Sequence, residues 1–281
     1  MLPPLSLRGK LFEWGSRPYL VGVLNVTPDS FSDGGLYLSR EAALKRAEEL
    51  IEGGADIIDI GGESTRPFAR PVPLEEELRR VVPVIEALRN RFPEIPISID
   101  TYKARVAEEA LSAGADLVND ISALRLDPEM VKVVAKHKAP IILMHMKGTP
   151  QTMQIDPTYD DVLREVKDFL EERVSFAEKN GIEKDKIILD PGIGFGKRFE
   201  DNLRIIKYVD YFKSLRRPLM LGPSRKSFLG QIVKKEAAER DPATMAVVAY
   251  AALKGVDLIR VHNVSMARDV ILVMEALKEV R

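Results

Sequence analysis

The sequence contains no cysteine, one tryptophan and only three histidines among its 281 residues. The absence of cysteine excludes disulfides, thiolate metal sites and cysteine nucleophiles. Neither sign of charge dominates, because 42 basic residues face 43 acidic ones for a net charge of −1. This balance gives no support to a general nucleic-acid or membrane-surface role, so any anion site must be local.

Long apolar runs are also missing. None approaches the roughly 20 residues that a helix needs to span a bilayer. Residues 1–8 lack the basic region followed by an apolar core that marks a signal peptide. We therefore expect a cytoplasmic protein without a nucleic-acid or membrane partner.

Short apolar runs alternate with helical patterns along the whole chain. These runs are nearly continuous in apolar character, which is typical of parallel strands covered by helices. The expected strands are residues 20–24, 57–60, 97–99, 117–118, 141–144, 187–189, 219–221 and 258–261. The expected helices are residues 41–52, 74–91, 103–113, 128–137, 157–180, 199–214, 242–254 and 265–279.

Local signals support these boundaries. Asp127, Asp156 and Asp241 each precede a proline, the pattern of an N-cap followed by the first helical position. Three similar turns, 54–56, 114–116 and 255–257, each join a helix to a strand. Eight such units over about 250 residues predict an α/β fold, a single (β/α)₈ TIM barrel domain spanning residues 1–281. A doubly wound open sheet shares the alternation and is the alternative.

Every expected strand ends in a polar or charged group. In a barrel these C-terminal strand ends form the active site. The polar segments are Asn25, 61–67, Asp100, 119–120, 144–145, 190–196, 224–227 and 260–262. This asymmetry places the site at that end of the barrel.

The residue types at the strand ends fall into two groups. Asp100, Asn119 and Asp190 can accept from N–H groups of a ring edge. The cationic or basic group suits phosphate or carboxylate oxygens and comprises Arg66, Arg225, Lys226, Arg260 and His262. Together they suit a substrate with a nitrogen-rich heterocycle at one end and an anionic group at the other.

Each of these residues also has a structural explanation. Asp100 and Asp190 could be N-caps of the helices that follow, and Asn119 could hold a loop together. His145 and His262 could be core histidines. Asp120 fits a loop stabiliser better than a ligand.

The segment 25–35 is longer than the 2–6 residues that commonly join a strand to a helix. It is rich in hydroxyls, carboxylates and glycine. Such a loop is either a solvated turn or a mobile cover over a polar site.

Two segments carry a family resemblance. Asn25-Val-Thr-Pro-Asp-Ser-Phe-Ser-Asp-Gly-Gly35 and Asp59-Ile-Gly-Gly-Glu-Ser-Thr-Arg-Pro67 resemble the first and second signatures of the dihydropteroate synthases. The segments 98–100, 119–121, 144–153, 190–195, 224–228 and 260–262 also resemble family segments, in the family's order. Members often continue with glycine after the second signature, whereas this chain has Phe68.

The resemblance implies a pterin-binding TIM barrel that acts as a transferase of folate biosynthesis and forms a C–N bond. Such an enzyme joins p-aminobenzoate to 6-hydroxymethyl-7,8-dihydropterin diphosphate, giving 7,8-dihydropteroate and pyrophosphate. It also implies Mg²⁺ as cofactor, a homodimer and competition by sulfonamides. We expect an SN1-like path, in which the C–O bond to the diphosphate breaks before the amine attacks.

The resemblance also assigns residues. The catalytic group is Asp100, Asp190, Lys226, Arg260 and His262. The pterin ring is held by Asp100, Asn119, Asp190 and Lys226, with Ile121, Met144 and Phe195 packed near the ligands. Asn25 contacts Mg²⁺ and the diphosphate, which also binds Arg66, Arg260 and His262. The p-aminobenzoate pocket uses Phe31, Thr65, Pro67, Lys226 and Ser227, with Phe31 and Asp33 on a flexible loop that closes over it together with residues 65–67.

Two other functions share parts of this pattern. A barrel that passes a methyl group from methyltetrahydrofolate to a corrinoid protein has similar pterin aspartates and asparagine. It has no need for the Ser-Arg-Lys-Ser cluster at 224–227 or the Thr-Arg-Pro loop at 65–67. A non-catalytic pterin-binding subunit would be expected to lose the lysine or loop residues, and none is lost.

Overall fold

The computed structural model describes residues 2–26, 35–66 and 68–280. Eight parallel strands form its sheet, in the order β8-β7-β6-β5-β4-β3-β10-β9. The sheet closes between β8 and β9, where Leu189 pairs with Leu219 and the Leu189 amide donates to the Pro218 carbonyl at 2.9 Å. Closure confirms the barrel and excludes the open sheet. The strands are β3 (Tyr19–Asn25), β4 (Ile57–Gly61), β5 (Ile97–Asp100), β6 (Leu117–Asp120), β7 (Ile141–Met144), β8 (Ile187–Asp190), β9 (Met220–Leu221) and β10 (Leu258–Val261).

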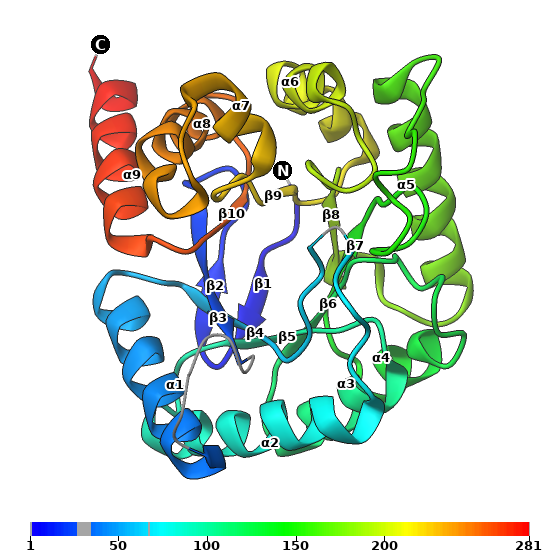
Figure 1. The fold of residues 1–281 in the computed structure, drawn as a ribbon, viewed down its shortest axis with the longest axis vertical. Helices are drawn as coiled ribbons and strands as arrows, with labels where there is room; N and C mark the ends of the chain where they lie inside the picture. Colours follow the sequence, from blue (N-terminus) through cyan, green and yellow to red (C-terminus); the bar gives the residue numbers. More distant parts are fainter. Residues whose placement is uncertain (1, 27–34, 67, 281) are drawn as a thin grey trace.

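Helices surround the barrel on the outside (Figure 1). They are α1 (Gly35–Glu52), α2 (Leu74–Arg91), α3 (Ala104–Ala113), α4 (Met130–His137), α5 (Val162–Lys179), α6 (Phe199–Lys207), α7 (Ser227–Val233), α8 (Asp241–Leu253) and α9 (Val264–Glu279). Short 3₁₀ helices span Lys184–Lys186, Val209–Leu215 and Ala237–Glu239. Within the described residues, none of these helices is long and apolar enough to cross a membrane.

A hairpin that the sequence patterns did not predict fills the N-terminal end of the barrel. Strands β1 (Leu5–Leu7) and β2 (Lys10–Phe12) pair antiparallel. Their apolar side chains form one buried cluster with the barrel-strand residues at this N-terminal end. The cluster comprises Leu5, Leu7, Phe12, Trp14, Tyr19, Val21, Ile57, Leu117, Ile142, Ile188, Met220 and Leu258. The polar end of the barrel therefore lies above an apolar plug.

The three repeated turns share one interaction. Each ends in an aspartate whose carboxylate accepts the backbone N–H of a residue at the start of the neighbouring strand. The bonds are Leu20 N to Asp56 at 2.8 Å, Ile97 N to Asp116 at 2.9 Å and Leu219 N to Asp257 at 2.9 Å. Asp56 also binds Lys10 and Arg17, and Asp116 also binds Arg8 and Arg89. Asp257 also accepts the Gly15 amide. The repeat thus fastens adjacent strands and docks the hairpin.

The predicted helix starts at the three Asp-Pro pairs need correction. Helix α5 begins at Val162, and its N-cap is Asp161, which accepts from the amides of Leu163 and Arg164. Asp156 lies five residues earlier with a φ of +47°, outside the helix. Asp127 does accept the Glu129 amide at 3.0 Å, as a cap would, although α4 begins only at Met130, and Asp241 is the first residue of α8. A proline fixes one backbone angle, but only a carboxylate in reach of the first free amides makes a cap.

Candidate active site

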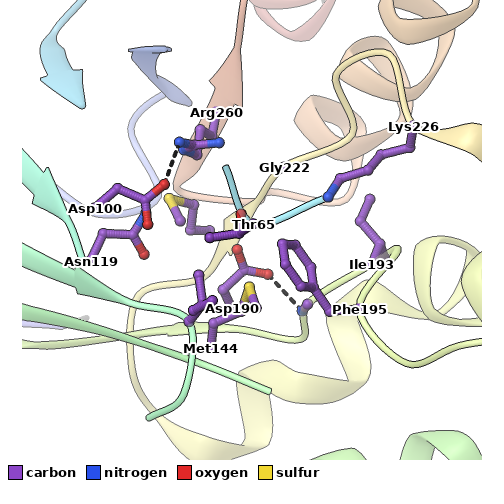
Figure 2. Close-up of a pocket in the computed structure, with 13 residues that line it drawn as sticks. Thr65, Asp100, Asn119, Met144, Asp190, Ile193, Phe195, Gly222, Lys226 and Arg260 are labelled. Carbon is purple, nitrogen blue, oxygen red and sulfur yellow. Dashed lines mark hydrogen bonds and ion pairs between the residues drawn. The ribbon is translucent and has the colours of Figure 1, made fainter. Parts of the chain in front are cut away.

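The polar strand ends meet in one pocket (Figure 2). Its lining residues are Thr65, Asp100, Asn119, Ile121, Met144, Asp190, Gly192, Ile193, Phe195, Met220, Gly222, Lys226 and Arg260. Asp100, Asn119, Met144 and Asp190 are or adjoin the last residues of β5 to β8. Parallel strands in register bring these side chains to the same level of the barrel.

Arg260 links the acids at the floor of the pocket. Its Nε donates to Asp59 Oδ2 at 2.6 Å and its Nη2 donates to Asp100 Oδ2 at 2.8 Å. Asn119 Nδ2 donates to the same Asp59 oxygen at 3.2 Å. Burial opposes the charge of Arg260, but Asp59 and Asp100 outweigh it and raise its pKa. The guanidinium therefore stays positive and fixes both carboxylates.

Several acceptors at the floor remain available. Asp59 Oδ1, Ser98 Oγ, Asp100 Oδ1 and Asn119 Oδ1 are buried and have no hydrogen-bond partner among the described residues. Buried polar atoms in proteins are nearly always paired. A ligand whose ring edge carries N–H donors would satisfy these oxygens.

Burial also changes the ionisation of the pocket's charged groups. It raises the pKa of Asp100 to about 7, against the attraction of Arg260. It raises the pKa of Asp190 to about 6, although the Gly192 amide and Lys226 favour the carboxylate. Burial and the nearby Arg260 charge lower the pKa of Lys226 to about 8. The pocket thus holds acids and a lysine that titrate near neutral pH, as is common at functional sites.

The loop after β8 folds tightly against β7. The Gly192 amide donates to Asp190 Oδ1 at 2.7 Å. Gly192 has a φ of +67°, and a Cβ there would meet the His145 carbonyl oxygen at 1.9 Å, so only glycine fits. The loop then places the Phe195 ring 4.1 Å from Lys226 Nζ, a cation–π contact. Figure 2 shows Lys226 reaching into the pocket beside Phe195.

His262 lies beside the pocket in a defined hydrogen-bonded state. Its backbone amide donates to Ser224 Oγ at 3.1 Å, and that Oγ lies 2.7 Å from His262 Nδ1. Burial, with the charges of Arg260, Arg225 and Arg66, lowers the pKa of His262 to about 3. The imidazole is therefore neutral at pH 7. We expect the Ser224 hydroxyl to donate to Nδ1, which would leave the ring proton on Nε2.

Arg66 and Asn25 lie at the rim. The charge of the exposed Arg66 lowers the pKa of both Lys226 and His262, which places its guanidinium near them. A Cβ built on Gly61 would lie 3.8 Å from Asn25 Oδ1 and 3.6 Å from Asp100 Oδ2. The Asn25 amide oxygen and the Asp100 carboxylate therefore both lie next to Gly61.

Comparison with known proteins identifies the family of this chain. The sequence pattern of the family described as "Pterin binding enzyme" matches residues 21–262. The chain is 49% identical over 276 residues to a dihydropteroate synthase of Synechocystis sp., covering 98% of this chain and 95% of that protein. The chain belongs to the dihydropteroate synthase family.

Solved dihydropteroate synthase structures have the same fold. The Yersinia pestis enzyme, described as a sulfonamide drug complex, superposes with a TM-score of 0.93 at 41% identity, covering 99% of this chain and 100% of that one. The Xanthomonas albilineans enzyme with 4-aminobenzoic acid also gives 0.93, at 42% identity, with full coverage of both chains.

Most residues that the family resemblance implied do come together in this dihydropteroate synthase fold. Asp100, Asn119, Ile121, Met144, Asp190, Phe195, Thr65, Lys226 and Arg260 line the pocket. Ser227 is the first residue of α7, is exposed and is not among the lining residues. Phe31, Asp33 and Pro67 lie outside the described residues, so their predicted places in the p-aminobenzoate site stay predictions.

The structure shows which strand-end residues have the structural roles considered above and which do not. Neither Asp100 nor Asp190 caps a helix, because Lys103 and Arg198 hold the N-cap positions of α3 and α6. Asp120 is a loop stabiliser, as expected, since it accepts from the Ser122 and Leu124 amides.

Two other residues at the strand ends, Arg225 and His145, make contacts within the protein scaffold. Arg225 pairs with both oxygens of Asp241, at 2.7 and 2.8 Å, and is not among the residues that line the pocket. His145 is buried, and its Nδ1 lies 2.9 Å from Lys197 Nζ. That contact ties the loop after β7 to the loop after β8.

Asp59 is the functional candidate that the strand-end rule missed. It is fully buried in the middle of β4, two residues before the strand ends. A carboxylate inside an otherwise apolar strand is the signal that could have found it.

Proposed function

We propose that the protein is a dihydropteroate synthase that joins p-aminobenzoate to 6-hydroxymethyl-7,8-dihydropterin diphosphate, releasing pyrophosphate. The observation that carries the proposal is one pocket with unpaired acceptors at its floor and the cations Lys226 and Arg260 in its lining. The floor suits the N–H edge of a pterin, and the cations suit a diphosphate. The Xanthomonas relative, whose structure holds 4-aminobenzoic acid, supports the second substrate.

In this proposal the pterin lies against Asp100, Asn119 and Asp190. Its ring N–H groups donate to the free oxygens of Asp100 and Asn119 and to the carboxylate of Asp190. Ionised carboxylates at these positions favour positive charge that spreads into the ring as the diphosphate departs. Met144, Ile121 and Phe195 pack on the ring and keep water away.

The diphosphate lies toward Arg260, Arg66 and the Nε2–H of His262. These donors stabilise the charge that develops on the leaving oxygen. The C–O bond breaks first and its electron pair leaves with pyrophosphate. The amine nitrogen of p-aminobenzoate, neutral at pH 7, then forms the C–N bond and loses a proton, so no strong base is needed.

Mg²⁺ fits this arrangement as a cofactor carried with the diphosphate. The described part of the chain holds no cluster of three or more His, Cys, Asp or Glu side chains that could bind a metal ion. Mg²⁺ commonly takes one or two protein oxygens beside substrate phosphates and water. The amide oxygen of Asn25, at the end of β3, would be the protein ligand. When bound, the ion neutralises charge on the leaving pyrophosphate.

The p-aminobenzoate ring would lie above the pterin, between Thr65 and Lys226, with Ser227, Phe31 and Pro67 at its edge. Asp33 would move with Phe31 on the closing loop. Because sulfonamides resemble p-aminobenzoate, they should compete for this site. The Yersinia pestis relative, solved as a sulfonamide drug complex, supports this expectation.

Pyrophosphate release tests the reaction. Purified protein with the pterin diphosphate and Mg²⁺ should release pyrophosphate only when p-aminobenzoate is present, with dihydropteroate formed in equal amount. Methyl transfer from methyltetrahydrofolate to a corrinoid protein would instead support the methyltransferase. Pterin binding without turnover under any condition would support a binding subunit.

We also propose that the chain is one domain over residues 1–281 and forms a homodimer in the cytoplasm. Neighbouring helices α8 and α9 carry exposed apolar side chains that a partner copy would cover. They are Leu253 on α8 and Met266, Leu272, Val273 and Leu277 on α9.

A further inference from the structure

Lys103 contacts both ends of the loop that follows β4. Its Nζ contacts the carboxylate of Glu63, two residues before Thr65. The same Nζ donates to the Val72 carbonyl oxygen at 2.7 Å, just before α2 begins at Leu74. One ammonium group therefore joins the two ends of the loop.

This ammonium group also offsets part of the charge of a buried acidic pair. Nζ donates to the carboxylate of Glu77 on the first turn of α2. Glu63 and Glu77 are 7% and 1% exposed, so water cannot replace the lysine. Burial raises the pKa of Glu77, and Lys103 opposes that change. Without Lys103, two buried carboxylates would face each other uncompensated, a strongly unfavourable arrangement.

Neutral donors complete the network on the side of β5. The Tyr102 hydroxyl donates to Glu63 at 2.7 Å, and the Thr101 hydroxyl donates to Glu77 at 2.8 Å. Both residues follow Asp100 directly in the chain. The base of the loop is thus hydrogen-bonded to the residues that directly follow Asp100 at the end of β5.

The loop presents two active-site residues between these anchors. Thr65 lines the pocket, and the charge of Arg66 acts on Lys226 and His262. Farther along, the Phe68 amide donates to the Pro150 carbonyl at 3.1 Å, so the tip rests on the loop after β7. Thr65 and Arg66 therefore lie between the base contacts made by Lys103 and the contact of the tip with Pro150.

We propose that Lys103 is a positioning residue that holds the loop after β4 closed at its base and so sets Thr65 and Arg66 at the rim. The part that concerns catalysis rests on the proposed function, in which these two residues face p-aminobenzoate and the diphosphate. The part that concerns the loop does not depend on it.

Chymotrypsin tests the loop directly. Phe68 is 66% exposed, so cleavage after it is limited by the opening of the loop rather than by access to the ring. Lys103→Met should speed cleavage at the 68–69 bond by about tenfold or more. Mass spectrometry of the fragments measures the cleavage rate. The matched control is Arg105→Met on α3, which removes an exposed pair with Glu109 and should leave the rate unchanged.

Kinetics of the same variants test the positioning. Lys103→Met should raise KM for p-aminobenzoate by about tenfold, while the Kd of 6-hydroxymethyl-7,8-dihydropterin without its diphosphate stays within about twofold, because the floor is untouched. Lys103→Arg, which keeps a cation with several donors, should restore most of the loss. If Lys103→Met does not fold, the double variant with Glu77→Gln removes the unpaired carboxylate and should still show fast cleavage.

Unchanged cleavage and unchanged KM in Lys103→Met would overturn the proposal, even if the protein melted at a lower temperature. A wild-type protein that makes no dihydropteroate would overturn the proposed function instead. In that case the cleavage rates would still decide whether Lys103 holds the loop.

Discussion

Arg260, Asp59 and Asp100 form the charged floor of the pocket. A buried ion pair seldom adds stability over apolar packing, because desolvation offsets the attraction. Here the arrangement leaves one buried oxygen of each carboxylate without a hydrogen-bond partner among the described residues. These residues are therefore better explained by binding than by folding.

Binding of the pterin should depend on pH through these acids. The ionised carboxylate accepts from the ring N–H groups, so a proton taken up by Asp190 or Asp100 removes an acceptor. Their pKa values are about 6 and about 7, so affinity should rise as pH increases through this range. Titration calorimetry from pH 5 to 8 measures this change in affinity for the pterin. Asp190→Asn should lose the part of the rise near pH 6; the full wild-type rise in that variant would contradict the assignment.

The tautomer of His262 gives a second prediction. With only three histidines in the chain, ¹⁵N spectra of the imidazole rings can be assigned with single His variants. At pH 7 His262 should be neutral with its proton on Nε2 and Nδ1 accepting from Ser224. Ser224→Ala should shift the Nδ1 signal toward that of an unbonded nitrogen, and Ser224→Thr should not. A wild-type ring protonated on Nδ1 would show that the hydrogen bond runs the other way.

At the scale of elements, strand order and side-chain alternation decide which residues meet. Asp100, Asn119 and Asp190 could be predicted because each is the polar end of an apolar run. Asp59 could not be found this way, since its contact with Arg260 on β10 reaches across β3, which lies between the two strands in the barrel. The three-residue strands of the hairpin are too short to show a period-two pattern, and α7 is too short for a helical one. The pairing of Arg225 with Asp241 depends on tertiary contacts that no local pattern shows.

The repeated aspartates give a prediction about the opposite end of the barrel. Asp257 accepts the backbone amides of Leu219 and Gly15, so Asp257→Ala leaves both without this acceptor. Losing a buried hydrogen bond in this way costs about 1–3 kcal/mol. The thermal midpoint should fall by about 2–4 °C per kcal/mol, with KM values unchanged. Asp168→Ala, at an exposed site on α5, is the control, and an equal effect of the two variants would contradict the role of the repeat.

The whole molecule combines a closed barrel, an apolar plug at one end and a polar pocket at the other. This division separates residues that stabilise the fold from residues that bind substrate, as in other barrels. Changes at the plug should therefore alter stability, and changes at the pocket should alter binding.

The outer surface gives a prediction for the assembly. Val273 and Leu277 are 60% and 63% exposed on α9, one helical turn apart. Light scattering should show a dimer, and the double variant Val273→Glu with Leu277→Glu should be a monomer. Leu11→Glu, at an exposed site on the hairpin, should remain a dimer. A wild-type monomer at micromolar concentration would contradict the proposed homodimer.

The central claim is that the acceptors on the barrel floor bind the pterin ring. Calorimetric titration of 6-hydroxymethyl-7,8-dihydropterin diphosphate into wild type and Asp190→Ala at pH 8, with Mg²⁺ present, tests it most directly. Losing a buried charged acceptor typically costs about 2–5 kcal/mol, so the variant should bind about a hundredfold more weakly or not measurably. An Asp190→Ala protein that binds the pterin diphosphate as tightly as wild type would contradict the claim.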